Sequence, residues 1–124
     1  MKINKILYVE DNPIKYASVE RFLRGLGYAN VSQAFDSNEA FELLKEECFD
    51  LIILDMHFKY DGIDDHAAGE KTMKQIRDSG IDTPIVFCSS RNWKIPGSLG
   101  NIFYNERRDW ESEARELFQN LIDK

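Results

Sequence analysis

Two hydrophobic patterns alternate along this chain: short uninterrupted apolar runs, and longer segments in which apolar residues recur at helical spacing. The runs Ile6–Val9 and Leu51–Leu54 contain no polar interruption except a tyrosine hydroxyl. Such runs are typical of strands covered on both faces, as in a parallel sheet. Further strands are predicted at 30–35, at 84–88 and, more weakly, at 101–104.

Segments with helical spacing separate these strands. Asn12 followed by Pro13 predicts a helix start, with Asn12 as the N-cap. Asp36 and Glu39 have the spacing of a capping box and predict the start of a second helix, with Ser37 as the alternative cap. Two more helices are predicted at about 69–79 and 109–122, whereas the Pro-Gly pair within 90–100 allows only a short one.

Strand–helix alternation repeated in this way predicts an α/β fold, a (βα)5 unit with one doubly wound, five-stranded parallel sheet and right-handed crossovers. The chain has 124 residues, which is the size of one domain, and its 43% hydrophobic content suits a folded core. In such sheets the functional site lies beyond the carboxyl ends of the strands. The residues that end the strands are therefore the candidates for chemistry.

Carboxylates and a hydroxyl occupy those strand ends. Glu10 and Asp11 follow the first strand, Asp55 follows the third and Ser89 follows the fourth. We expect the three carboxylates to converge, and their mutual repulsion favours a bound cation, for which oxygen ligands with room for water suit Mg²⁺. A carboxylate beside Mg²⁺ can attack a phosphoryl group and become an acyl phosphate, while a nearby hydroxyl donates to a phosphoryl oxygen.

Composition narrows the class of protein further. Sixteen basic residues against 22 acidic ones give a net charge of −6, which argues against a nucleic-acid surface and leaves room for an acidic cation pocket. Cys48 and Cys88 are expected to be free thiols in a reducing compartment. No secretory leader or membrane-length apolar run is recognisable, so we expect a cytoplasmic protein that binds neither nucleic acid nor membrane.

In the order and spacing of these strand-end residues, the chain resembles the receiver domain of bacterial two-component response regulators. The acidic pair of that family matches Glu10 and Asp11, and its phosphoacceptor aspartate matches Asp55. Its switch Thr or Ser matches Ser89. His57 stands at the position whose backbone carbonyl is a metal ligand in the family.

The resemblance implies a flavodoxin-like receiver fold, with residues 1–124 forming a single receiver domain. It also implies phosphoryl transfer to Asp55 from a sensor histidine kinase or phosphotransfer protein, with Mg²⁺ as cofactor. Such a module is a signalling protein and not an enzyme. Because no output domain is recognisable beside it, we expect the signal to pass to a downstream protein partner.

One departure from the family concerns the end of the fifth strand. The family has a lysine followed by a proline there, where this chain has Tyr104 and Asn105, and its switch aromatic falls on Asn101. Arg91 and Lys94, on the neighbouring loop, are the candidates to replace the missing ammonium. The departure favours an alternative function, a pseudo-receiver that acts as a phosphorylation-independent protein-interaction module.

A second departure is the segment 58–66, which adds chain beside Asp55. Matching the loop glycine of the family to Gly69 makes this loop several residues too long. Matching it to Gly62 instead leaves the loop slightly short and lengthens the next helix. In either case, the added chain can shield an acyl phosphate from water or offer a docking surface.

A third hypothesis is a Mg²⁺-dependent phosphohydrolase of the haloacid dehalogenase type, which also uses an aspartyl nucleophile. That chemistry needs a second aspartate at the position of His57, together with a cap and a distal lysine. The sequence offers no candidates for these parts. The signalling function is therefore favoured over the enzyme.

Overall fold

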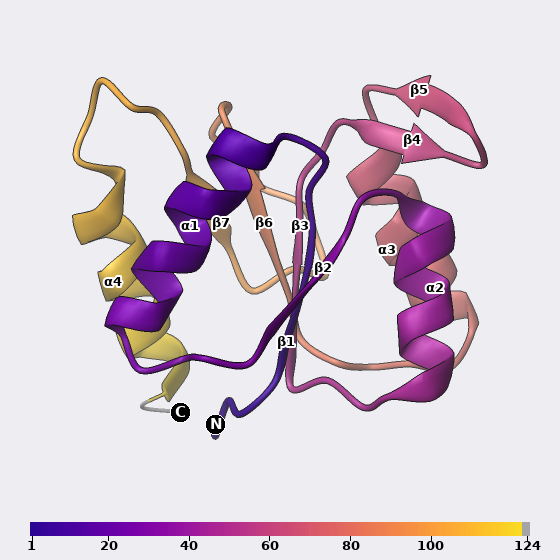
Figure 1. The fold of residues 1–124 in the computed structure, drawn as a ribbon, viewed down its shortest axis with the longest axis horizontal. Helices are drawn as coiled ribbons and strands as arrows, with labels where there is room; N and C mark the ends of the chain where they lie inside the picture. Colours follow the sequence, from indigo (N-terminus) through magenta and orange to yellow (C-terminus); the bar gives the residue numbers. More distant parts are fainter. Residues whose placement is uncertain (123–124) are drawn as a thin grey trace.

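A computed structural model describes residues 1–122 and contains a five-stranded sheet in which all neighbouring strands are parallel (Figure 1). This architecture confirms the predicted α/β fold with a doubly wound sheet. The strands lie in the order β2 (Val31–Ala34), β1 (Ile6–Val9), β3 (Leu51–Leu54), β6 (Ile85–Ser89) and β7 (Asn101–Phe103).

Helices cover both faces of the sheet. α1 (Pro13–Gly25) and α4 (Trp110–Ile122) pack on one face, and α2 (Ser37–Glu46) and α3 (Ala68–Asp78) pack on the other (Figure 1). Alternate side chains of a strand enter opposite layers, so Ile6 and Tyr8 join the α1–α4 core while Leu7 and Val9 join the α2–α3 core. Burial on both sides explains why the strand sequences are apolar at consecutive positions.

The starts of α1 and α2 are fixed by side-chain caps, as predicted. The Asn12 side chain accepts hydrogen bonds from the backbone N–H groups of Ile14 and Lys15, at 3.0 and 3.1 Å. The Asp36 side chain accepts one from the N–H of Glu39 at 2.9 Å. The cap at Asn12 places the first turn of α1 directly after the acidic residues that follow β1, which brings that turn to the edge of the sheet where the site is expected.

The crossover between β6 and β7 departs from the (βα)5 repeat. Residues 90–100 contain no helix, so residues 1–122 combine four helices, and not five, with the five strands of the main sheet. Pro96, and Gly97 with φ of +93°, interrupt this segment, which accordingly forms an irregular loop. None of the helices in the described part of the chain is long and apolar enough to cross a membrane.

The added segment near residue 60 is a β-hairpin that the sequence analysis did not predict. β4 (Phe58–Tyr60) pairs antiparallel with β5 (Ile63–Asp65). Asp61 and Gly62 form the turn with φ of +54° and +82°, the combination that tight hairpins favour. Because α3 begins at Ala68, the alignment that lengthens this helix is wrong, and the hairpin is an insertion before it.

Gly69 permits the close approach of α3 to the end of β3. Its backbone N–H donates to the carbonyl of Met56 at 3.0 Å. A Cβ atom at this position would overlap the carbonyl oxygen of Asp55 and lie 3.0 Å from the Cα atom of Met56. The glycine therefore holds the helix against the strand end that carries Asp55.

We predict that Gly69→Ala lowers the free energy of unfolding by about 1–3 kcal/mol, because backbone atoms must move to admit the methyl group. Gly25→Ala is the matched control, since a Cβ at that helical position meets no atom within 4 Å. It should leave stability unchanged or raise it by up to about 1 kcal/mol. Urea unfolding of both variants measures the difference, and equal stabilities would contradict the close contact.

Candidate functional site

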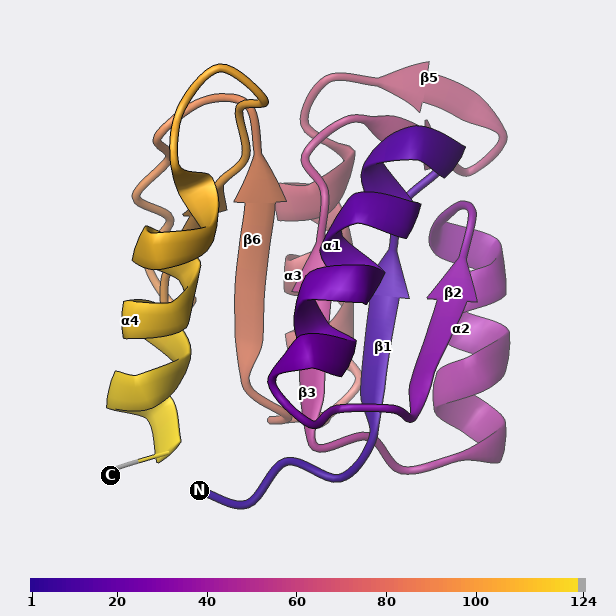
Figure 2. The ribbon, with the colours of Figure 1, turned by 60° about the vertical axis from the view of Figure 1, so that its left-hand side comes forward.

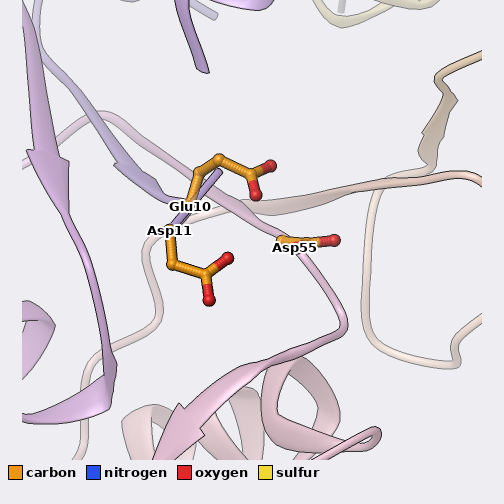
Figure 3. A group of neighbouring side chains, drawn as sticks. All are labelled: Glu10, Asp11 and Asp55. Carbon is orange, nitrogen blue, oxygen red and sulfur yellow. The ribbon is translucent and has the colours of Figure 1, made fainter. Parts of the chain in front are cut away.

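The carboxyl ends of the parallel strands lie at one edge of the sheet, which Figure 2 shows by the common direction of the arrowheads of β1, β2 and β6. Glu10 and Asp11 follow β1 there, and Asp55 follows β3. One carboxylate oxygen from each of the three residues lies within 4.8 Å of the others (Figure 3). The predicted convergence of these carboxylates is confirmed.

The three carboxylates differ in their exposure to solvent. Glu10 is fully buried, Asp55 is partly buried and Asp11 is exposed. Glu10 accepts a hydrogen bond from the Tyr8 hydroxyl at 2.8 Å. Burial raises the pKa of Glu10 to about 7, an effect that the nearby Lys15 opposes and Asp55 reinforces. A charged Glu10 therefore depends on a positive partner at this edge of the sheet.

That positive partner is Lys15, from the first turn of α1. Its Nζ atom lies 2.9 Å from Oδ1 of Asp55 and 3.2 Å from Oε1 of Glu10. It also donates to the backbone carbonyl of Cys88, in β6, at 3.0 Å. The ammonium thus contacts a residue after β1, a residue after β3 and a residue within β6.

The acidic environment keeps Lys15 charged. Burial by itself would lower the pKa of its ammonium, but the acidic neighbours Cys88, Asp55 and Glu10 together raise this pKa above the usual range. Burial raises the pKa of the Cys88 thiol to about 12, so this thiol is neutral near pH 7. At that pH the charge opposite Lys15 accordingly comes from the carboxylates.

Tyr104 occupies the strand end where the family resemblance calls for a lysine. Its buried ring packs against Trp110, with ring centroids 5.1 Å apart, and its centroid lies 5.8 Å from Nζ of Lys15. Arg91 and Lys94 are both exposed, and Arg91 stacks over Trp93. Lys15 is the residue that pairs with Asp55, while Arg91 lines the same cavity as Asp55. The replacement of the ammonium by Arg91 or Lys94 at a phosphoryl group stays a prediction.

Lys15 is not among the residues predicted from the sequence, because it lies in the first turn of α1 and neither at a strand end nor in the loop after β6. A signal was nevertheless present. Side chains in the first turn of a helix lean toward its N-terminus, and the predicted Asn12 cap put that turn directly beyond Glu10 and Asp11. A basic residue in this turn was the one to test against the acidic cluster.

The two oxygens of Asp55 have different surroundings. Oδ1 accepts from Lys15 and from the backbone N–H of Met56, the latter at 2.8 Å. Within residues 1–122, no hydrogen bond ends on Oδ2. One oxygen is therefore held and oriented, while the other is available to a ligand or a reacting group.

Ser89 and His57 lie at the same pocket. Both line, with Asp55, a cavity of about 510 Å³ that His66 and Trp93 also border. The buried Ser89 hydroxyl accepts from the N–H of Arg91 at 3.0 Å and donates to its carbonyl at 3.2 Å. The exposed ring of His57 lies 4.3 Å from the ring of His66, so the hairpin reaches the mouth of the pocket.

The donor set suits a small, hard divalent cation. Its side-chain ligands would be carboxylate oxygens of Glu10, Asp11 and Asp55, which are the atoms that Mg²⁺ prefers. Asp11 is exposed, which leaves space for the water ligands that Mg²⁺ retains. Lys15 contacts Glu10 and Asp55, so the ammonium balances part of the negative charge and leaves Asp11 for the metal.

Comparison with known proteins gives sequence matches to one family. The family model described as the response regulator receiver domain matches residues 6–95. The transcriptional regulatory protein CrdR of Helicobacter pylori is 34% identical over 87 residues, which cover 69% of this chain and 38% of CrdR. The transcriptional regulatory protein DltR of Streptococcus agalactiae is 27% identical over 88 residues, which cover 71% of this chain and 36% of DltR. The match thus spans little more than a third of these relatives.

Solved structures show the same fold. The Francisella response regulator 1452 receiver domain superposes with a TM-score of 0.71 at 21% identity, covering 93% of each chain. Response regulator TrrA from Thermotoga maritima, solved in complex with Mg²⁺-BeF, gives a TM-score of 0.70 at 21% identity and covers 93% of this chain and 99% of TrrA. The family model ends before β7, so Tyr104 lies outside the matched residues.

The two thiols should differ in reactivity, because Cys88 is buried with a raised pKa whereas Cys48 is exposed. At neutral pH we expect one thiol of the folded protein to react rapidly with a chromogenic disulfide reagent, and both to react after unfolding in urea. The variant Cys48→Ser should show no rapid phase. A rapid phase that persists in Cys48→Ser would contradict the burial of Cys88.

Proposed function

This chain belongs to the family of response regulator receiver domains, and from that premise we propose that it is a phosphorylation-controlled switch whose acceptor is Asp55. We further propose that residues 1–124 act as one receiver unit. The observation that carries the proposal is the convergence of Glu10, Asp11 and Asp55 at the strand ends. Three carboxylates this close repel one another, and a bound cation relieves that repulsion. With a divalent cation bound, the same carboxylates are well suited to phosphoryl transfer.

The proposed reaction transfers a phosphoryl group from a phosphohistidine on a sensor kinase or phosphotransfer protein. A carboxylate oxygen of Asp55 forms a bond to phosphorus, and the bond from phosphorus to the imidazole nitrogen breaks. The electron pair of that bond remains on the imidazole. Oδ2 of Asp55 is the proposed nucleophile, because Oδ1 already accepts from Lys15 and the Met56 N–H.

The residues proposed to hold Mg²⁺ are Glu10, Asp11 and Asp55, together with the backbone carbonyl of His57. When bound, the ion balances negative charge on the phosphoryl oxygens. Glu10 is fixed by the Tyr8 hydroxyl, so it serves to orient the cluster. Asp11 has the most open position and is the proposed direct ligand.

The proposed signal passes from Ser89 to the loop 90–100. Ser89 and Asn101 converge on Arg91, since the Asn101 side-chain amide donates to the Arg91 carbonyl at 3.0 Å, as the Ser89 hydroxyl does at 3.2 Å. Rotation of the Ser89 hydroxyl toward a phosphoryl oxygen would release its two hydrogen bonds to Arg91. Phosphorylation would thereby shift an existing equilibrium of this loop, which is the proposed contact for a downstream protein.

The pseudo-receiver alternative rested on the absence of a lysine at position 104. The ammonium of Lys15, 2.9 Å from Asp55, removes the main argument for it. The polar link from Asn101 to Arg91 likewise offers a route for the signal without an aromatic switch residue. The phosphorylated switch is therefore the function we favour.

Incubation with Mg²⁺ and acetyl phosphate should add one phosphoryl group to the native chain, as measured by intact mass. Asp55→Asn should add none, because its amide cannot form the acyl phosphate. Asp64→Asn removes an exposed carboxylate on the hairpin and should still be modified. Absence of a mass gain in the native chain, or an unchanged gain in Asp55→Asn, would overturn the proposal.

Titration calorimetry should detect Mg²⁺ binding that depends on Asp11. We expect Asp11→Asn to weaken the affinity at least about tenfold, because a charged ligand with an open coordination side is lost. Asp82→Asn removes an equal charge at an exposed position outside the acidic cluster. Equal losses in the two variants would attribute the effect to net charge and contradict a specific site.

A further inference from the structure

We propose that Lys15, on α1, is the cation that binds the phosphoryl group on Asp55, in place of a lysine at the end of β7. This inference rests on the proposed phosphorylation of Asp55. It assigns a role to a residue that no family motif marks, on a different element from the one where the resemblance places the ammonium. It also predicts how metal binding and phosphorylation respond to the same substitution.

The position of the Lys15 ammonium is fixed by the surrounding backbone and side chains. Its side chain is 13% exposed, and Nζ lies within 3.2 Å of oxygens from Glu10, Asp55 and Cys88. An ammonium has three N–H donors, and three acceptors surround this one. The α1 cap at Asn12 anchors the turn from which the side chain extends. Lys15 is thus part of a built site.

The direction from which Lys15 approaches Asp55 suits a phosphoryl contact. Its bond to the Cys88 carbonyl places Nζ toward β6, and the next residue, Ser89, carries the proposed switch hydroxyl. The ammonium and the hydroxyl therefore flank the acceptor from the β6 side. A phosphoryl group on Asp55 would gain one charged and one neutral donor there.

Tyr104 explains why the ammonium comes from α1. Its buried ring occupies the end of β7 and leaves that strand without a cation near Asp55, while its face lies within cation–π distance of Nζ. The aromatic ring forms one wall of the Lys15 site. Phosphorylation adds negative oxygens beside the ammonium, so Lys15 would exchange its bond to Oδ1 for a bond to a phosphoryl oxygen without loss of its other partners.

A positive group at this position has opposite effects on the two ligands of the site. It attracts the phosphoryl oxygens and repels a divalent cation held by the same carboxylates. Lys15→Met keeps most of the apolar stem and removes the charge. We expect this variant to be phosphorylated by acetyl phosphate at least about tenfold more slowly while it binds Mg²⁺ several-fold more tightly.

The decisive comparison adds an ammonium at the end of β7, at position 104. Tyr104→Lys alone should remain phosphorylatable, and the double variant Lys15→Met with Tyr104→Lys should recover much of the rate that Lys15→Met loses. Lys15→Arg should retain part of the rate, because it keeps the charge with a different geometry. Rates come from intact mass at saturating Mg²⁺, affinities from calorimetry and folding from circular dichroism.

The possible results separate a failure of the proposed function from a failure of the role proposed for Lys15. If the native chain gains no phosphoryl group, the proposed function fails and this inference fails with it. If the native chain is modified and Lys15→Met is modified as fast or faster, only the role of Lys15 is overturned. A joint loss of Mg²⁺ affinity and rate in a folded Lys15→Met would make Lys15 a structural residue. Should Lys15→Met not fold, Lys15→Gln, which also removes the charge but keeps a polar side chain, is measured in its place and decides in the same way.

Discussion

Repulsion among three carboxylates at one edge of the sheet is the constraint on which the site depends. Glu10, Asp11 and Asp55 approach within 4.8 Å because parallel strands end at the same edge, and the buried position of Glu10 makes its charge costly. The chain meets this constraint with the ammonium of Lys15, which contacts two of the three. The remaining negative charge is what a divalent cation would balance.

Helix α1 links the stability of the fold to this chemistry. Its inner face buries Val19, Phe22 and Leu23 against the sheet, and its first turn delivers Lys15 to the acidic cluster. Because the helix start is fixed by the Asn12 cap, the ammonium is positioned by local hydrogen bonds and by the core together. Under the proposed function, Lys15 supplies the positive charge that Tyr104 at the end of β7 lacks.

Two segments outside the repeating strand–helix pattern border the pocket. The hairpin β4–β5 brings His66 against His57, and the loop 90–100 brings Trp93 to the same cavity. The hairpin is an insertion between β3 and α3, whereas the loop stands where the repeating fold would have a helix. Side chains from these two segments therefore line the cavity next to Asp55, above a sheet with the fold of the family.

The sequence by itself determined the strands, the two capped helix starts, the parallel sheet and the identity of the clustered carboxylates, because apolar runs, caps and strand-end charges are local signals. It could not determine the hairpin, whose strands have only three residues each, or the loss of a helix in 90–100. Nor did it reveal that Lys15 pairs with Asp55 across 40 positions of chain. Tertiary structure alone decided that pairing, since only the packing of α1 on the sheet brings an ammonium and a carboxylate so distant in sequence into contact.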